Sequence, residues 1–347
     1  MSVPVRIDLT DPASFPSRRA EDWKWTDVRR WLREAPAPSA PVEVAPGGPF
    51  GALGGEEIAF GNGRAADGGF AAEYVADGER ALRLRFVSRA DGTGHQTTTR
   101  VTVKAGASLL LLESYEGAGA GYVANTALAV AVEPGARLER IVLLDEPEDA
   151  LSFSAAEVRL GAGASFRQTV LASGARLQRH ETRVAHPGEG ASVTLDGVYA
   201  LDGARHADLT TVVDHQGVGG VTSQLTKGVV RDTARGVFQG RIVVAPGADG
   251  TDARMGHHAL ILSDRAEVDA KPELEIYADD VSCAHGNTIG ALDEQALFYA
   301  MSRGLPETDA RALLTHAFLG EVIDRIEHEG ARGIAAAWLA ARLGAVS

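Results

Sequence analysis

The segment DDVSCAHGNTIG, residues 279–290, contains the chain's one cysteine, Cys283, with His285 two residues after it. On an extended strand, residues i and i+2 lie on the same face, about 6–7 Å apart along the strand. A thiolate and an imidazole on one face are suitable ligands for iron or zinc. Two ligands leave a tetrahedral site incomplete. Either Cys283 is a buried structural cysteine, or another chain supplies the remaining ligands.

A pair of adjacent histidines, His257 and His258, offers further imidazoles for a metal or for an interface with a partner. Neighbouring residues on a strand point to opposite faces, so at most one of the two faces any given site. The chain has no P-loop sequence, and it has no CxxC, HExxH or GxSxG motif. ATP hydrolysis on a P-loop fold is therefore excluded for this chain.

Composition limits the class of protein. The 347 residues include 45% hydrophobic and 23% charged residues, and the formal net charge is -13. Such a charge argues against nucleic acid or an anionic membrane surface as the main partner. No apolar run approaches the ~20 residues of a membrane span, and the N-terminus lacks the pattern of a secretory signal. We therefore expect a cytoplasmic protein without disulfides.

A repeated turn divides the centre of the chain. Gly-Ala follows an apolar alternating stretch at Gly106, Gly135, Gly163 and Gly190, with spacings of 29, 28 and 27 residues. Pro246-Gly247-Ala248 repeats the pattern 57 residues after the last of these. A strand-and-turn repeat of this length favours a β-helix, because stacked coils bury apolar faces that a single coil cannot. A β-sandwich or a β-propeller is the alternative.

The two ends of the chain have different patterns. Residues 17–34, with three tryptophans, predict an amphipathic helix capped by Ser17, and the proline-rich residues 35–55 predict a linker. After the strands, Asp293 is a predicted N-cap of a helix that Gly304 ends, and Pro306 opens a second helix.

Apolar residues of the second helix fall at helical spacing: Ala310, Leu313, Leu314, Ala317, Phe318, Val322 and Ile326. A last helix is predicted over about 331–343. The expected organisation is a helical segment and linker over 1–55, a β-helix core over 56–285 and a helical domain over 286–347.

Residues 237–314 resemble the SufB/SufD family of iron–sulfur cluster assembly proteins, most specifically in DAKPELEIYADDVSCAHG and ALDEQALFYAMSRGLP. The stretch EDWKWTDVRRW near the N-terminus is similar to the start of that family. Chain length, the single cysteine and the CAHG sequence favour the SufD branch over the longer SufB branch. Where this chain has Met255-Gly256-His257-His258, the family usually has small polar residues.

The resemblance implies a mainly β fold, a right-handed β-helix flanked by N-terminal and C-terminal α-helical domains. It implies a non-catalytic scaffold that pairs with SufB, binds the ATPase SufC and receives sulfur through a cysteine desulfurase pathway. Cys283 and His285 would then lie at the SufB–SufD interface, near a transient cluster shared with SufB, and would contribute to iron acquisition there. His257 and His258 are further interface candidates.

The same resemblance implies that the C-terminal helices dock the ATPase through a set of mostly apolar residues: Leu297, Phe298, Tyr299, Ser302, Arg303, Gly304, Leu305, Pro306, Leu313 and Phe318. The family is associated with a reduced flavin, although the chain contains no flavin motif.

Two other functions remain open at this point. One is a β-helix carbohydrate-active enzyme, against which stand the missing signal peptide and the lack of a clustered Asp/Asp/Arg signature. The other is a SufB/SufD-like homodimer acting alone, in which two copies of Cys283 and His285 meet at a two-fold axis.

Overall fold

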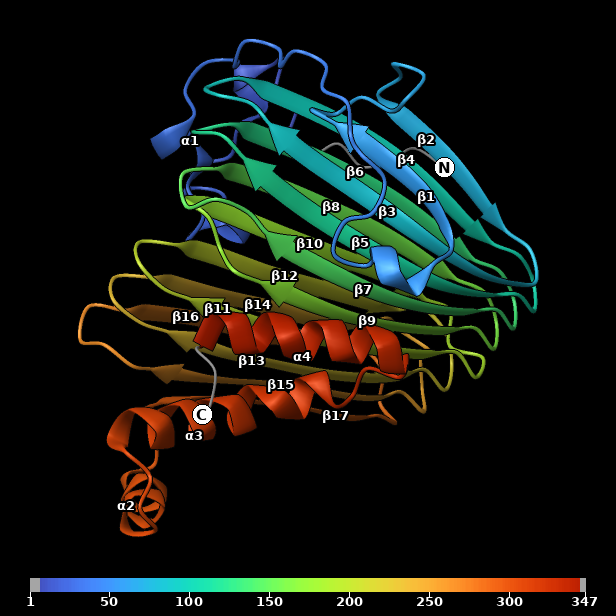
Figure 1. The fold of residues 1–347 in the computed structure, drawn as a ribbon. Helices are drawn as coiled ribbons and strands as arrows, with labels where there is room; N and C mark the ends of the chain where they lie inside the picture. Colours follow the sequence, from blue (N-terminus) through green and yellow to red (C-terminus); the bar gives the residue numbers. More distant parts are fainter. Residues whose placement is uncertain (1–6, 344–347) are drawn as a thin grey trace.

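The computed structural model describes residues 7–343, and within them two parallel sheets form most of the molecule. Each turn of the chain gives one strand to each sheet (Figure 1). The odd sheet consists of β1 Glu56–Gly61, β3 Glu79–Arg89, β5 Ser108–Ala118, β7 Arg137–Asp145, β9 Ser165–Ala172, β11 Ser192–Leu201, β13 Val221–Val230, β15 Asp252–Ile261 and β17 Ser282–Gly290. The even sheet consists of β2 Ala71–Ala76, β4 Gly94–Val103, β6 Val123–Val132, β8 Leu151–Leu160, β10 Leu177–His186, β12 His206–His215, β14 Arg235–Val244 and β16 Glu267–Ile276.

Every strand pairs in parallel with the strand two positions away in the sequence, and consecutive strands lie in different sheets. This topology is a β-solenoid, and it excludes the sandwich and propeller alternatives, which are built from antiparallel neighbours. The fold class predicted from the sequence is confirmed. Each coil contains two strands.

The repeated glycines lie in the turns that precede odd strands. Gly135 and Gly190 have φ angles of 69° and 75°, a left-handed conformation that glycine adopts without a steric penalty. The sequence repeat skips one coil between Gly190 and Gly247. In that coil Gly219, with φ 73°, occupies the equivalent position in the turn. Its neighbour is glycine rather than alanine, which hid this coil from the Gly-Ala pattern.

The solenoid interior is filled mainly by aliphatic side chains at alternate strand positions, as the two-residue period of a strand requires. Leu82 and Leu111 on neighbouring odd strands, for example, are paired in register and fully buried. In-register stacking of this kind continues coil after coil and buries the apolar face that no single coil covers.

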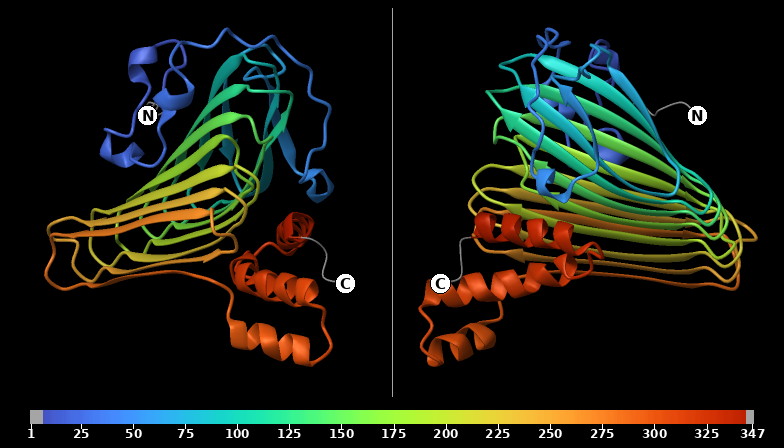
Figure 2. Two further views of the ribbon diagram at one scale, coloured as in Figure 1. Left: turned by 90° about the vertical axis from the view of Figure 1, so that its left-hand side faces the viewer. Right: turned by 45° about the vertical axis from the view of Figure 1, so that its right-hand side comes forward.

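The N-terminal segment is irregular, and the long helix predicted over residues 17–34 is wrong. The chain forms short turns of 3-10 helix, η1 Pro12–Ser14 and η2 Glu21–Trp23, and one turn of α-helix, α1 Val28–Trp31, preceded by Asp27 and not by Ser17. These pieces cover the outer face of the even sheet (Figure 2).

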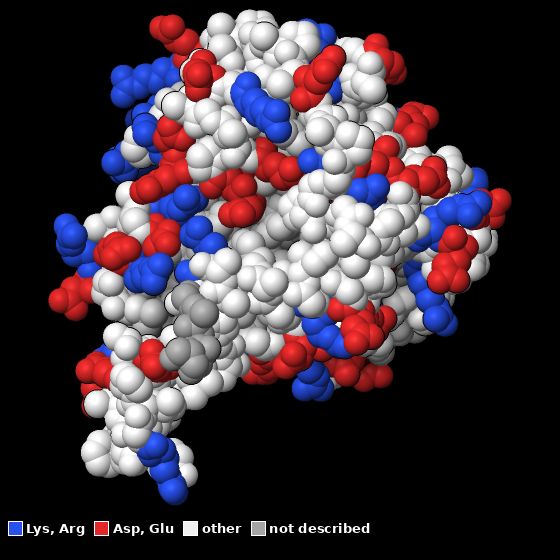
Figure 3. Space-filling model, in the orientation of Figure 1, with Lys and Arg blue, Asp and Glu red and all other residues white. Residues whose placement is uncertain are grey.

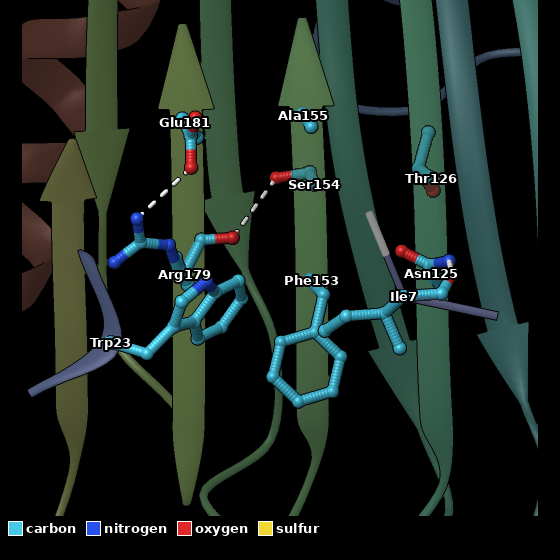
Figure 4. A pocket seen from close by; sticks show the side chains of 9 residues that line it. All are labelled: Ile7, Trp23, Asn125, Thr126, Phe153, Ser154, Ala155, Arg179 and Glu181. Carbon is cyan, nitrogen blue, oxygen red and sulfur yellow. Dashed lines mark hydrogen bonds and ion pairs between the residues drawn. The ribbon is translucent and has the colours of Figure 1, made fainter. Parts of the chain in front are cut away.

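Side-chain contacts hold these short turns against the even sheet. Trp23 packs edge-on against Phe153, with ring centroids 6.4 Å apart, and lies 4.2 Å from the Arg179 guanidinium (Figure 4). Three residues later, the Thr26 hydroxyl bonds both His206 and Asp208 on β12. Trp23 is buried, whereas Trp31 is exposed.

Residues 35–55 contain no regular element except η3, Gly51–Leu53. The segment is nevertheless fixed to the first coils: Asn62 donates to the Ala40 carbonyl at 2.8 Å, and Arg85 donates to the Ala45 carbonyl at 2.8 Å. It carries the chain from the outer face of the even sheet to β1 (Figure 2). It is a fixed connection and not a loose linker.

In the part of the chain that the structure describes, three helices follow the last strand: α2 Glu294–Ser302, α3 Glu307–Ile323 and α4 Glu329–Leu343. The predicted cap is confirmed, since the Asp293 side chain accepts hydrogen bonds from the backbone N–H groups of Gln295 and Ala296. Gly304 follows α2 with φ 95°. None of the helices within residues 7–343 has the length and apolarity needed to cross a membrane.

Helices α3 and α4 pack on the outer face of the odd sheet, opposite the N-terminal segment (Figure 2). Leu319, Val322 and Trp338 contribute to this cluster. The apolar stripe predicted for α3 is only partly buried, since Leu313 and Ala317 are exposed. Helix α2 contacts α3 and projects past the last coil (Figure 1).

Candidate functional site

The last coil leaves one end of the solenoid open. Strands β16 and β17 are the final strands of the even and odd sheets, and within the described residues each pairs with a neighbour on one side only. An unpaired strand edge presents backbone N–H and C=O groups that can bond to a strand of another chain. The open end is therefore a surface on which both sheets can be extended.

Cys283 and His285 lie on the inner side of this end. They pair in register with Ala253 and Met255 of β15, which are both buried in the solenoid interior. Because strands stacked in register point equivalent side chains the same way, Cys283 and His285 share a face, as their spacing predicts. Cys283 is half-buried and packs against the apolar cluster that contains Ala253 and Met255, and His285 is exposed.

The electrostatics of Cys283 favour the neutral thiol. Burial raises the pKa of the thiol, the nearby Asp252 carboxylate raises it further, and the Ala253 backbone lowers it by a hydrogen bond. A metal ion binds the thiolate, so binding here releases a proton. Within residues 7–343, no cluster of three or more His, Cys, Asp or Glu side chains could hold a metal ion. Cys283 and His285 thus provide at most half of a site.

The adjacent histidines point to opposite sides of the odd sheet, as expected. The His257 ring is buried in the interior, stacked on Phe238 with centroids 4.7 Å apart, and its nitrogens contact Tyr199 and Asn287. His258 faces outward, where its Nδ1 lies 2.7 Å from the Thr288 hydroxyl. The interface role of these two histidines stays a prediction.

Helix α2 exposes apolar side chains. Phe298 is 74% exposed and Tyr299 is 61% exposed, and Met301 and Leu313 lie at the surface as well. The projecting lobe carries few charged side chains in the view of Figure 3, as an apolar docking surface requires. Sequence analysis missed Met301, although it follows Phe298 at helical spacing.

The other residues predicted to dock an ATPase divide into two groups. Leu297, Leu305 and Phe318 are buried or partly buried, and Phe318 lies 4.5 Å from the Lys227 ammonium. They hold α2 and α3 in place. The remaining four form exposed surface at the end of α2 and in the turn after it: Ser302, Arg303, Gly304 and Pro306.

A parallel β-solenoid with one open end, a Cys/His pair on its inner side and C-terminal helices on one sheet defines the class of this protein. The chain belongs to the SufBD core family of the SUF system for iron–sulfur cluster assembly, whose family model matches residues 86–318.

Curated relatives agree with this assignment. The iron–sulfur cluster assembly protein SufD of Escherichia coli is 36% identical over 200 residues, which cover 57% of this chain and 47% of that protein. A SufBD family protein of Synechocystis is 30% identical over 256 residues, covering 71% of this chain and 56% of that protein. SufD of Bacillus subtilis is 32% identical over 145 residues, which cover 42% of this chain and 33% of that protein. The matched part spans about half or less of the length of these relatives.

Proposed function

We propose that this chain is a SufD-like, non-catalytic scaffold subunit that takes part in iron–sulfur cluster assembly in the cytoplasm. The observation that carries the proposal is the open end of the solenoid, where Cys283 and His285 share the inner side of β17, the last strand of the odd sheet. Membership of the SufBD core family supports the general role. The nascent cluster is the cargo of this assembly, and it passes on to apo-proteins.

The partner that we propose for the open end is a SufB-like protein. Addition of its strands to the edges of β16 and β17 satisfies the unpaired backbone groups of both sheets. A cysteine and a carboxylate of that partner complete the ligand set that Cys283 and His285 begin. Thiolate, imidazole and carboxylate groups together are a suitable donor set for iron.

The second partner that we propose is a SufC-like ATPase on α2 and the start of α3. The chain itself lacks a P-loop, so the ATPase must be a separate protein. Exposed Phe298, Tyr299 and Leu313 supply the apolar contact that a docking surface needs. The sulfur supply from a cysteine desulfurase pathway and a reduced flavin bound at the level of the complex remain predictions from the resemblance.

Anaerobic purification of the tagged chain from its own cells tests the whole proposal. We expect a longer homologue and an ATPase to elute with it. Recovery of the chain alone, monomeric and colourless, would contradict the scaffold role and favour the β-helix enzyme. A self-dimer with iron–sulfur absorbance would replace the SufB-like partner with a second copy of this chain.

Cys283→Ala tests the site within that complex. Cys283 is only half-buried, so we expect the variant to fold with nearly unchanged stability and to bind the same partners. Loss of one of the few ligands should reduce cluster formation at least tenfold, measured by visible absorbance in the reconstituted complex. Ser282→Ala, an exposed neighbour on the outer side of β17, is the matched control. Full cluster formation by Cys283→Ala would show that the thiol is only structural.

A further inference from the structure

A chain of hydrogen bonds runs through the solenoid interior to its open end. The Tyr199 hydroxyl on β11 lies 2.9 Å from Nε2 of His257 on β15. Nδ1 of the same imidazole lies 2.7 Å from Oδ1 of Asn287 on β17. Tyr199 and His257 are fully buried, whereas Asn287 is exposed at the open end. Three odd strands are thus connected by polar contacts in a mainly apolar interior.

The direction of each hydrogen bond follows from the chemistry of the groups. Burial lowers the pKa of His257 to about 4, so the ring is neutral and carries one N–H. Oδ1 of Asn287 can only accept, which places that proton on Nδ1. Nε2 is then an acceptor, and the Tyr199 O–H donates to it. The carbonyl end of the Asn287 amide is therefore fixed, and its NH₂ end points away from His257.

Two glycines make room for this arrangement. A side chain at Gly228, the in-register neighbour of Tyr199 on β13, would place its Cβ 1.8 Å from Tyr199 Cζ, and one at Gly236 would lie 2.5 Å from Cε2. The tyrosine ring occupies the space of both missing side chains, so its hydroxyl reaches past a whole coil to His257. Phe238 stacks on the imidazole with an interplanar angle of 2°, which holds the ring plane.

Asn287 continues the row of Cys283 and His285. The three residues are at positions i, i+2 and i+4 of β17, and their in-register partners Ala253, Met255 and His257 all face the interior. The rise of a strand puts Asn287 about 6–7 Å from His285 along the same face. A sulfur atom of a cluster bound at His285 lies within reach of the Asn287 NH₂ group at this spacing.

We propose that Asn287 is a positioning residue of the cluster site: its NH₂ group, oriented by His257 and Tyr199, donates a hydrogen bond to a sulfur atom of the cluster. This inference rests on the proposed function, since it needs a cluster at Cys283 and His285. Hydrogen bonds to the sulfurs of a cluster change its stability and its reduction potential. Loss of such an outer contact changes metal affinity by about 10–100-fold.

The test uses the complex with its co-purifying partners, loaded with cluster under anaerobic conditions. Asn287→Ala removes the donor, and we expect the cluster to be lost to a chelator about tenfold faster, with a shifted visible circular dichroism spectrum. Asn287→Asp keeps the acceptor oxygen but has no NH₂ group, and it should behave like Asn287→Ala. Partner binding should not change. Thr288→Ala is the matched control, because it removes the equivalent contact with His258 on the outer side of the same strands.

Three outcomes separate this inference from the proposed function. If the unmodified complex never holds a cluster, the proposed function fails and the inference fails with it. If it holds a cluster that Asn287→Ala leaves unchanged in lifetime and spectrum, only the inference fails. An equal effect of Thr288→Ala would likewise overturn it, since the change would then be structural. Nitrogen-15 spectra of the histidines give a readout without a cluster: His257 must carry its proton on Nδ1, and a proton on Nε2 would refute the orientation.

Discussion

Two charged side chains, Arg140 and Glu113, lie inside the solenoid, where their side chains are 1% and 0% exposed. Arg140 donates to both carboxylate oxygens at 2.8 and 2.9 Å and to the Gln168 carbonyl at 2.5 Å. Tyr115 donates to the same carboxylate at 2.6 Å. Desolvation of a buried ion pair is costly, and only this complete set of partners offsets it. Removal of one of the two charges should therefore lower the free energy of unfolding more than removal of both charges.

Glu113→Leu leaves the Arg140 charge buried without its counter-ion. We expect the free energy of unfolding to fall by about 3–5 kcal/mol in urea denaturation. The double variant Glu113→Leu, Arg140→Met replaces the pair by apolar groups of similar size, and it should recover most of this loss. Equal destabilisation of the single and the double variant would show that the cost comes from altered packing and not from the unpaired charge.

The sequence predicted the Cys283 and His285 pair because their common face depends only on the alternation within one strand. It did not predict the contact of His257 with Asn287. That contact depends on the register between β15 and β17, in which paired residues are 30 positions apart in the sequence. It also depends on the glycines that leave space for the Tyr199 ring. A signal was present, because the coil period places Asn287 one repeat after His257.

At the scale of elements, glycines have two separate roles in the coils. Gly135 is in a turn at φ 69°, with open space where a side chain would be. Gly228 lies within β13, where a side chain would collide with the Tyr199 ring. An added methyl group therefore destabilises the fold at Gly135 through the backbone conformation, and at Gly228 through collision with a neighbouring side chain.

Alanine substitutions distinguish these roles. Gly135→Ala should cost about 1 kcal/mol of unfolding free energy, the penalty of a left-handed backbone for a residue with a Cβ. Gly228→Ala should cost about 3 kcal/mol, because the interior must shift to accept the methyl group. Adding Tyr199→Leu should recover part of the loss at Gly228 and none at Gly135, as measured by urea denaturation. Equal costs at both positions, or no recovery, would contradict the steric role.

The N-terminal segment shows where element prediction from the sequence failed. Residues 17–34 have a helical apolar pattern, but the chain there forms separate short turns, and Trp23 and Thr26 are held by contacts with the even sheet. Tertiary contacts override local propensity here. The helix cap at Asp293 was predictable, because it depends on residues adjacent in the sequence.

At the scale of the whole molecule, the solenoid followed from the repeat spacing, since stacked coils of constant length must repeat in sequence. Which face each terminal segment covers could not be predicted. Both faces of the strands carry apolar residues, and only the structure places the N-terminal segment on the even sheet and α3 and α4 on the odd sheet (Figure 2). The open end could not be predicted either. The sequence shows where the last strand ends, but it does not show that, within residues 7–343, the outer edges of β16 and β17 both lack a neighbouring strand.

Buried neutral histidines are spread along the solenoid and affect its stability as a whole. Burial lowers the pKa of His95 and of His206 to about 4, and of His215 to about 3, from an ordinary value of 6.5. His95 is held between the hydroxyls of Ser39 and Ser88. Such a group is neutral in the folded state and takes up a proton more readily when the chain unfolds.

These histidines predict that the protein loses stability in mildly acidic solution. Because their folded-state pKa is depressed, their contribution is present above pH 6.5 and is lost as the pH falls toward 4. Asp196, whose pKa burial raises to about 6, acts in the opposite direction. His257, whose pKa burial also lowers to about 4, adds to the effect of the three histidines. Together these four histidines and Asp196 should lower the free energy of unfolding by about 4 kcal/mol between about pH 7 and about pH 5.5, measured by urea denaturation. His95→Gln keeps partners for both serines but cannot titrate, so it should reduce this dependence by about a third. A pH-independent stability in this range, or an unchanged slope in His95→Gln, would contradict the prediction.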